Sequence, residues 1–65
     1  MNKEEFLEYI RTNYDLSGEA FRLVKNIVDF IEANASDEAE RYSMACELLD
    51  GTIGLSDAEL RRISF

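Results

Sequence analysis

Histidine and proline are absent from this chain of 65 residues, and cysteine occurs once, as Cys46. Without a histidine, that thiol lacks the base that usually activates a cysteine nucleophile, and we expect it to be a buried structural residue. A single cysteine also excludes an internal disulfide and favours a cytoplasmic location. No apolar run approaches the length of a transmembrane helix, and the acidic start from Glu4 lacks the apolar core of a signal peptide.

Basic residues are few. The chain has 7 lysines and arginines against 14 aspartates and glutamates, which gives a net charge of −7. Direct binding to nucleic acid or to an anionic membrane is therefore disfavoured, because contacts to phosphate need lysine and arginine. Hydrophobic residues make up 46% of the chain, enough for one core. A core of this size supplies only about 3–5 kcal/mol, so we expect the domain to be marginally stable or completed by a partner.

Helix-capping patterns recur along the chain and predict its architecture. Each predicted helix starts at an asparagine or a serine: Asn2, Ser17, Ser36 and Ser56. A glutamate three residues after the first and the last of these completes a capping box. The chain shows no alternating pattern of the kind that marks a strand. We predict a small all-α bundle in one domain, 1–65, with four short helices over about 2–13, 17–34, 36–50 and 56–64.

The boundaries of these helices carry two further signals. Gly51 is predicted to end the third helix, because glycine adopts the left-handed conformation of a C-terminal cap without strain. Apolar pairs around three of the starts match the spacing of a hydrophobic staple. These pairs are Met1 with Phe6, Leu16 with Phe21, and Leu55 with Leu60.

The corner around Gly51 is similar to half of a calcium-binding EF-hand loop. With Gly51 at the sixth position, Cys46 and Leu48 fall at the first and third positions, where such a loop needs oxygen ligands. Asp57 falls at the twelfth position, where it is one methylene shorter than the usual glutamate. We interpret the stretch as a corner between two helices and predict neither a metal site nor a cofactor.

Helical periodicity predicts the buried faces of the first two helices. Phe6, Leu7, Tyr9, Ile10 and Tyr14 share one side of the first. The apolar face of the second covers roughly half its circumference, which predicts a central helix with more than one neighbour. That face consists of Ala20, Phe21, Leu23, Val24, Ile27, Val28, Phe30 and Ile31.

The third helix carries two apolar strips. Ala39, Tyr42, Cys46 and Leu49 form the expected buried strip. Met44 and Leu48, one turn apart, form a second strip on a different side of the helix. This second strip is either covered by a neighbouring element or open for binding. We predict a candidate interaction surface at the second strip, made of Met44, Leu48, Phe65, Tyr14 and Phe30.

Acidic side chains are the largest surface feature. They crowd the starts of the first and third helices and define a candidate acidic patch: Glu4, Glu5, Glu8, Asp37, Glu38 and Glu40. Such a patch either keeps the protein soluble or meets a basic protein surface, as a mimic of nucleic acid would.

Two classes of small helical protein were weighed. Acyl carrier proteins carry a prosthetic-group serine in an Asp-Ser-Leu motif, and Asp15, Leu16 and Ser17 have a similar composition in a different order. The long loop expected after their first helix is missing, so Ser17 is interpreted as a helix cap. Helix-turn-helix proteins need a basic recognition helix, whereas the third helix here is acidic. Neither class fits.

These observations favour a non-enzymatic, cytoplasmic protein-interaction module from a bacterium or a bacteriophage. We expect its partner to be another protein or a second copy, as in a homodimer, with no direct contact to nucleic acid or membrane. The alternative is an acidic inhibitor that mimics nucleic acid, and a carrier or enzymatic role comes third.

The corner around Gly51 should not bind calcium specifically, because Cys46 and Leu48 replace ligand oxygens. NMR amide shifts from Asp50 to Glu59 should stay unchanged as calcium is raised to millimolar concentration. Saturable shifts at micromolar calcium would show that the interpretation as a corner is wrong.

Overall fold

The computed structural model describes residues 2–63, which form four helices. Their order is α1 (Lys3–Asn13), α2 (Gly18–Asn34), α3 (Glu38–Ile53) and α4 (Asp57–Leu60). The described residues contain no strand. The prediction of a small all-α bundle of four helices is therefore confirmed.

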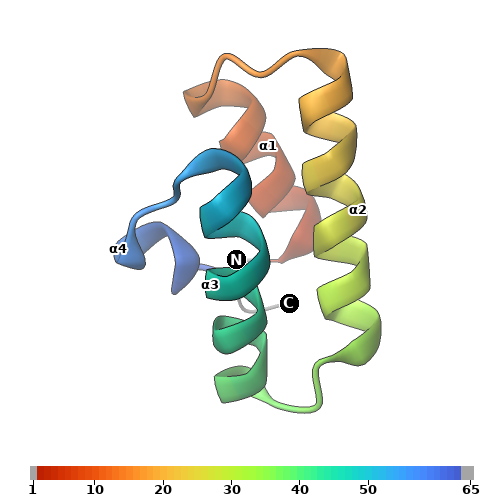
Figure 1. Ribbon diagram of the computed structural model, residues 1–65, viewed down its shortest axis with the longest axis vertical. Helices are drawn as coiled ribbons and strands as arrows, with labels where there is room; N and C mark the ends of the chain where they lie inside the picture. The colour runs from red at the N-terminus through yellow and green to blue at the C-terminus, as the bar shows by residue number, and fades with distance from the viewer. Residues whose placement is uncertain (1, 64–65) are drawn as a thin grey trace.

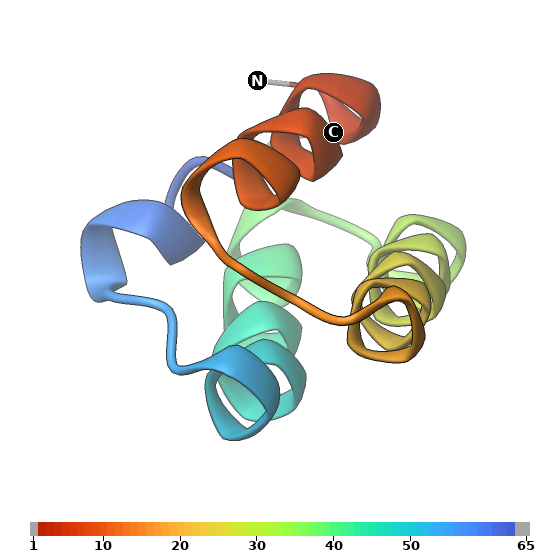
Figure 2. The same cartoon turned by 90° about the horizontal axis from the view of Figure 1, so that it is seen from above.

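The helices pack in a globule of 30 × 21 × 21 Å. The longest two, α2 and α3, run antiparallel and pack against each other, and α1 lies behind them (Figure 1). Seen from above, α4 lies beside α1 and α3, on the side away from α2 (Figure 2). Each long helix thus has one side turned toward a common centre.

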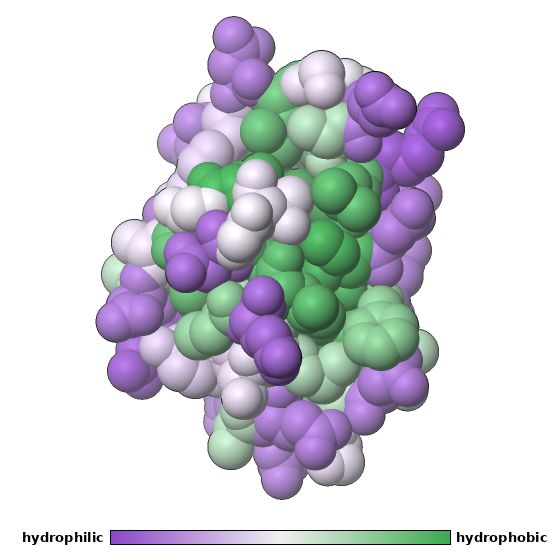
Figure 3. Space-filling view, in the orientation of Figure 1, coloured by the Kyte–Doolittle hydropathy of each residue, from purple (hydrophilic) through white to green (hydrophobic). Residues whose placement is uncertain are grey.

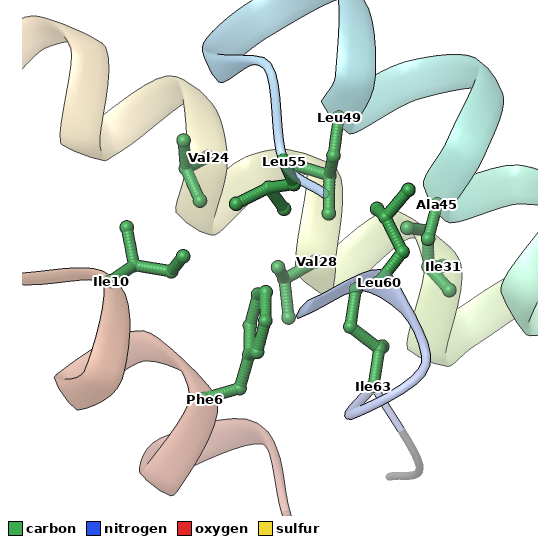
Figure 4. Packing of buried hydrophobic residues seen from close by; sticks show 10 residues of the cluster. All are labelled: Phe6, Ile10, Val24, Val28, Ile31, Ala45, Leu49, Leu55, Leu60 and Ile63. Atoms are coloured by element: carbon green, nitrogen blue, oxygen red, sulfur yellow. The ribbon is translucent and has the colours of Figure 1, made fainter. Parts of the chain in front are cut away.

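The centre is filled by apolar side chains from every helix and from the loops after α3 and α4. Figure 4 shows them converging between the ribbons. All are at most 4% exposed, and among residues 2–63 no polar or charged residue is buried with them. The core consists of Phe6, Ile10, Val24, Val28, Ile31, Ala45, Leu49, Leu55, Leu60 and Ile63.

Local capping explains where three of the helices begin. The side chain of Asn2 accepts a hydrogen bond from the Glu5 amide at 2.8 Å, and the Glu5 carboxylate accepts one from the Asn2 amide. Ser56 and Glu59 form the same reciprocal box at the start of α4. Ser17 accepts from the amide of Ala20. These predicted caps are confirmed.

The start of α3 differs from the prediction. Asp37, not Ser36, is the cap, and its carboxylate accepts a hydrogen bond from the Glu40 amide at 2.8 Å. Ser36 stands one residue earlier, where its amide and hydroxyl donate to the Glu40 carboxylate. Aspartate and serine cap equally well, so the neighbouring contacts decide which of the two adjacent residues does so.

The end of α3 lies one turn beyond the predicted one. Gly51 is inside the helix, and Gly54 is the residue with a left-handed backbone, at φ 63° and ψ 48°. The Gly54 amide donates to the carbonyl of Asp50. The prediction for Gly51 was therefore wrong, because the stretch holds two glycines that suit a cap and the later one is used.

The fourth helix is shorter than predicted, ending at Leu60. Its predicted staple residues Leu55 and Leu60 are both buried. Leu16 and Phe21, the pair around the start of α2, are half-buried and pack against the core. Met1 lies outside the described residues, so the remaining staple, with Phe6, stays a prediction.

Exchanging each glycine for alanine tests where α3 ends. Gly51→Ala should stabilise the fold by about 0.5–1 kcal/mol, since alanine favours a helix interior and a Cβ there meets nothing within 4 Å. Gly54→Ala should cost about 1–2 kcal/mol, because the left-handed conformation strains any side chain. Urea unfolding followed by circular dichroism measures both, and the opposite signs would restore Gly51 as the cap.

Candidate interaction surface

Two large apolar side chains of α2 remain open to solvent. Leu23 is 50% exposed and Phe30 is 53% exposed. They are seven residues apart, so they lie on nearly the same side of the helix. Sequence periodicity placed both in the buried face, and that expectation was wrong. The core takes only the side of α2 that carries Val24, Val28 and Ile31.

A hollow lies beside Phe30, between α2 and α3. It has a volume of about 280 Å³ and is lined by Asn26, Ile27, Phe30 and Leu48. Figure 3 shows hydrophobic side chains gathered over the region of α2 and α3 on this face. Together with Leu23 these four residues are called the α2–α3 surface below.

The predicted interaction surface is only partly assembled. Phe30 and Leu48 meet in the hollow. Met44 is half-buried and packs against the core. Tyr14 lies apart from them, because its hydroxyl group donates to Glu59 of α4. Phe65 lies outside the described residues, so its place in the surface stays a prediction.

Of the buried strip predicted on α3, only Leu49 is fully buried, and Ala45, which was in neither predicted strip, is buried with it. Ala45 and Leu49 are fully buried, whereas Met44, Leu48, Tyr42 and Cys46 are half-buried around them. Ala39, assigned to the buried strip, is exposed. An alanine carries too little apolar surface to mark the middle of a face, and the larger residues on either side therefore read as two strips.

Sequence reasoning did not single out Leu23, Asn26 and Ile27 as surface residues. The available signal was the width of the apolar face of α2, which exceeds what three short helices can cover. Asn26 was a second signal for a surface without charge. It lies three residues after Leu23 and four before Phe30, and so on the same side of the helix, in a chain of which 32% is charged.

The predicted acidic patch is exposed, but half of it serves local structure. Glu5 and Asp37 cap α1 and α3, and Glu40 holds Ser36. Glu4, Glu8 and Glu38, the other members, are also exposed. Lys3 precedes Glu4 and Glu5 in the sequence, and its ammonium group lies 3.1 Å from Asp29 and 2.9 Å from Glu32 of α2.

A polar cluster fastens α4 to α1. The hydroxyl groups of Tyr9 and Tyr14 both donate to Oε2 of Glu59, and the Tyr9 distance is 2.9 Å. The hydrogen bond from Tyr14, followed by the one from the Ser56 amide, lowers the pKa of Glu59 from 4.5 to about 2. Burial, then the bond to Glu59, raises the pKa of Tyr14 to about 12. At neutral pH the carboxylate of Glu59 therefore stays charged and the hydroxyl of Tyr14 stays neutral, which suits a structural contact.

The single cysteine lies near a second set of contacts between α3 and α4. Cys46 is half-buried, less than expected, and packs against the core. A hydrogen bond with Cys46, followed by burial, raises the pKa of Tyr42. The Tyr42 hydroxyl also donates to Asp57 at 3.2 Å, and Arg61 stacks on the ring at 4.9 Å.

Within residues 2–63, no three cysteine, aspartate or glutamate side chains gather where they could hold a metal ion. No helix of the same stretch is long and apolar enough to cross a membrane. Comparison with known protein families, curated proteins and solved structures found no match to this chain.

Removing the charge of Glu59 should destabilise the fold near neutral pH. Glu59→Gln keeps a capping group but loses charged hydrogen bonds, at a cost on the order of 1–3 kcal/mol. The pKa of Glu59 is lower in the folded state, so this stability is present above about pH 4.5 and is lost as pH falls toward 2.

Thermal unfolding between pH 7 and pH 2 measures this effect. The gap in Tm between the native chain and Glu59→Gln should narrow as the pH falls. The exposed Glu8, changed to Gln, is the matched control, with little effect expected. An equal gap at every pH would contradict the role given to the Glu59 charge.

Proposed function

We propose that this chain is a non-enzymatic protein-interaction module that docks through the α2–α3 surface. The supporting observation is that Phe30 stays half-exposed in a hollow that Ile27 and Leu48 also line, and that Leu23, seven residues earlier on the same helix, is half-exposed too. Exposed apolar residues are ordinary when scattered, but a continuous group beside a hollow is typical of a binding surface.

The energetics favour this use of the surface. Burying a leucine or phenylalanine side chain completely contributes about 1.5–3 kcal/mol relative to leaving it in water. Leu23 and Phe30 have gained about half of that within the fold and gain the rest only when a partner covers them. Polar substitutions there should therefore affect binding more than folding.

An acidic mimic of nucleic acid is the second candidate. Its support is the net charge of −7 and the exposure of all six residues of the acidic patch. Those residues are divided between the starts of two helices, and three of them are engaged in capping. A carrier or enzymatic role has no comparable support. A cytoplasmic location and a bacterial or phage origin remain expectations from the sequence.

Affinity capture with matched variants distinguishes the two candidates. Leu23→Gln combined with Phe30→Gln should abolish retention of the partner at low and at raised ionic strength, while Tm stays almost unchanged. Glu4→Gln combined with Glu8→Gln, the control, should retain the partner. If the variant with Glu4→Gln and Glu8→Gln loses the partner, the variant with Leu23→Gln and Phe30→Gln keeps it, and raised salt releases it from the native chain, apolar docking is overturned in favour of the acidic mimic.

A further inference from the structure

We propose that the α2–α3 surface is occupied by a second copy of this chain, with α2 packed antiparallel against α2 of that copy about a two-fold axis at Asn26. This inference rests on the proposed function and names its partner. A two-fold axis brings the same surface of both copies together, so the surface must be complementary to itself.

The outward side of α2 is suited to self-association, because its residues from Leu23 to Asn34 are uncharged between the two flanks of the helix. The chain as a whole is 32% charged with a net charge of −7. These exposed or half-exposed residues alternate between apolar and small polar types: Leu23, Asn26, Ile27, Phe30, Ala33 and Asn34. Glu19, seven residues before Asn26, is charged and exposed at the N-terminal end of the same side, and an antiparallel partner sets it beside Ala33 and Asn34 rather than beside the other Glu19. Two copies can therefore meet here without bringing like charges together.

The spacing of the large apolar residues also makes the surface complementary to itself. Leu23 and Phe30 stand three residues before and four residues after Asn26. A two-fold axis near Asn26 therefore sets Leu23 of each copy beside Phe30 of the other. It also sets the two Asn26 amides side by side, and each amide offers both a donor and an acceptor to the other.

Charged residues on the flank of α2 that lies away from α3 also fit the two-fold axis at Asn26. Arg22 and Asp29 are also seven residues apart and lie on that flank, with Arg22 exposed. In an antiparallel two-fold pair, each flank of a helix meets the same flank of its partner. Arg22 of each copy thus comes beside Asp29 of the other, whose side chain is 45% exposed although one oxygen holds Lys3.

The opposite flank extends the contact onto α3. Leu48 shares the hollow with Phe30, so a second α2 placed over Phe30 also covers Leu48. The pair Arg22 and Asp29 and the amide of Asn26 are each complementary to themselves about this axis, which favours a second copy over an unrelated apolar partner.

Sedimentation equilibrium of the purified full chain tests the inference. We expect a concentration-dependent mass that reaches twice the 7.5 kDa of one chain. Raising the ionic strength should tighten the association, because the two copies repel each other through a net charge of −7 each. Asn26→Lys should return the mass to that of one chain, since it sets two ammonium groups together at the axis. Thr12→Lys on α1, with the same change of charge, should leave the dimer intact.

Disulfide trapping tests the orientation. In a chain with Cys46→Ser, Asn26→Cys should form a covalent dimer on oxidation, and Thr12→Cys should not. A mass of one chain at millimolar concentration would overturn the inference, as would a dimer indifferent to Asn26→Lys. If that happens while Leu23→Gln with Phe30→Gln still abolishes capture of another protein, only the choice of partner fails. If capture is indifferent as well, the proposed function fails too.

Discussion

The width of the apolar face of α2 is the constraint on which the rest of this structure depends. Val24, Val28 and Ile31 give α1 and α3 a common side to pack on, and the core closes around them. The short α4 then fills the remaining side with Leu60 and is fastened to α1 through Glu59. Within residues 2–63 the remainder of the apolar face is covered only in part, and Leu23 and Phe30 stay about half exposed to water.

Charge and apolar surface are separated on this protein. Many acidic residues lie at helix starts. Their carboxylates accept hydrogen bonds from backbone amides there and lie at the positive end of the helix dipole. On the outward side of α2, the uncharged residues Leu23, Asn26 and Phe30 lie between Glu19 at one end and the flank that carries Arg22 and Asp29. The acids at these positions therefore stabilise helix starts, while the stretch from Leu23 to Phe30 offers a contact where two copies of the same net charge can meet.

Features set by neighbours in the sequence were predictable, and features set by distant contacts were not. The capping boxes at Asn2 and Ser56 join residues three apart, so the pattern alone identifies them. The use of Gly54 instead of Gly51 as the cap keeps Ile53, which packs against the core, inside α3. Likewise, the bonds from Tyr9 and Tyr14 to Glu59 join residues 50 and 45 apart. Phe30 was part of the predicted interaction surface, whereas the exposure of Leu23 was missed, because periodicity measures the width of an apolar face but not how much of it the other helices can cover.

In the proposed association, a second copy covers the outward side of α2. NMR amide shifts of the native chain, recorded as its concentration rises from micromolar to millimolar, test this directly. We expect changes confined to the outward residues of α2 and to the neighbourhood of Leu48, with the acidic starts of α1 and α3 unaffected. Unchanged shifts on α2, or changes confined to the acidic starts, would contradict it.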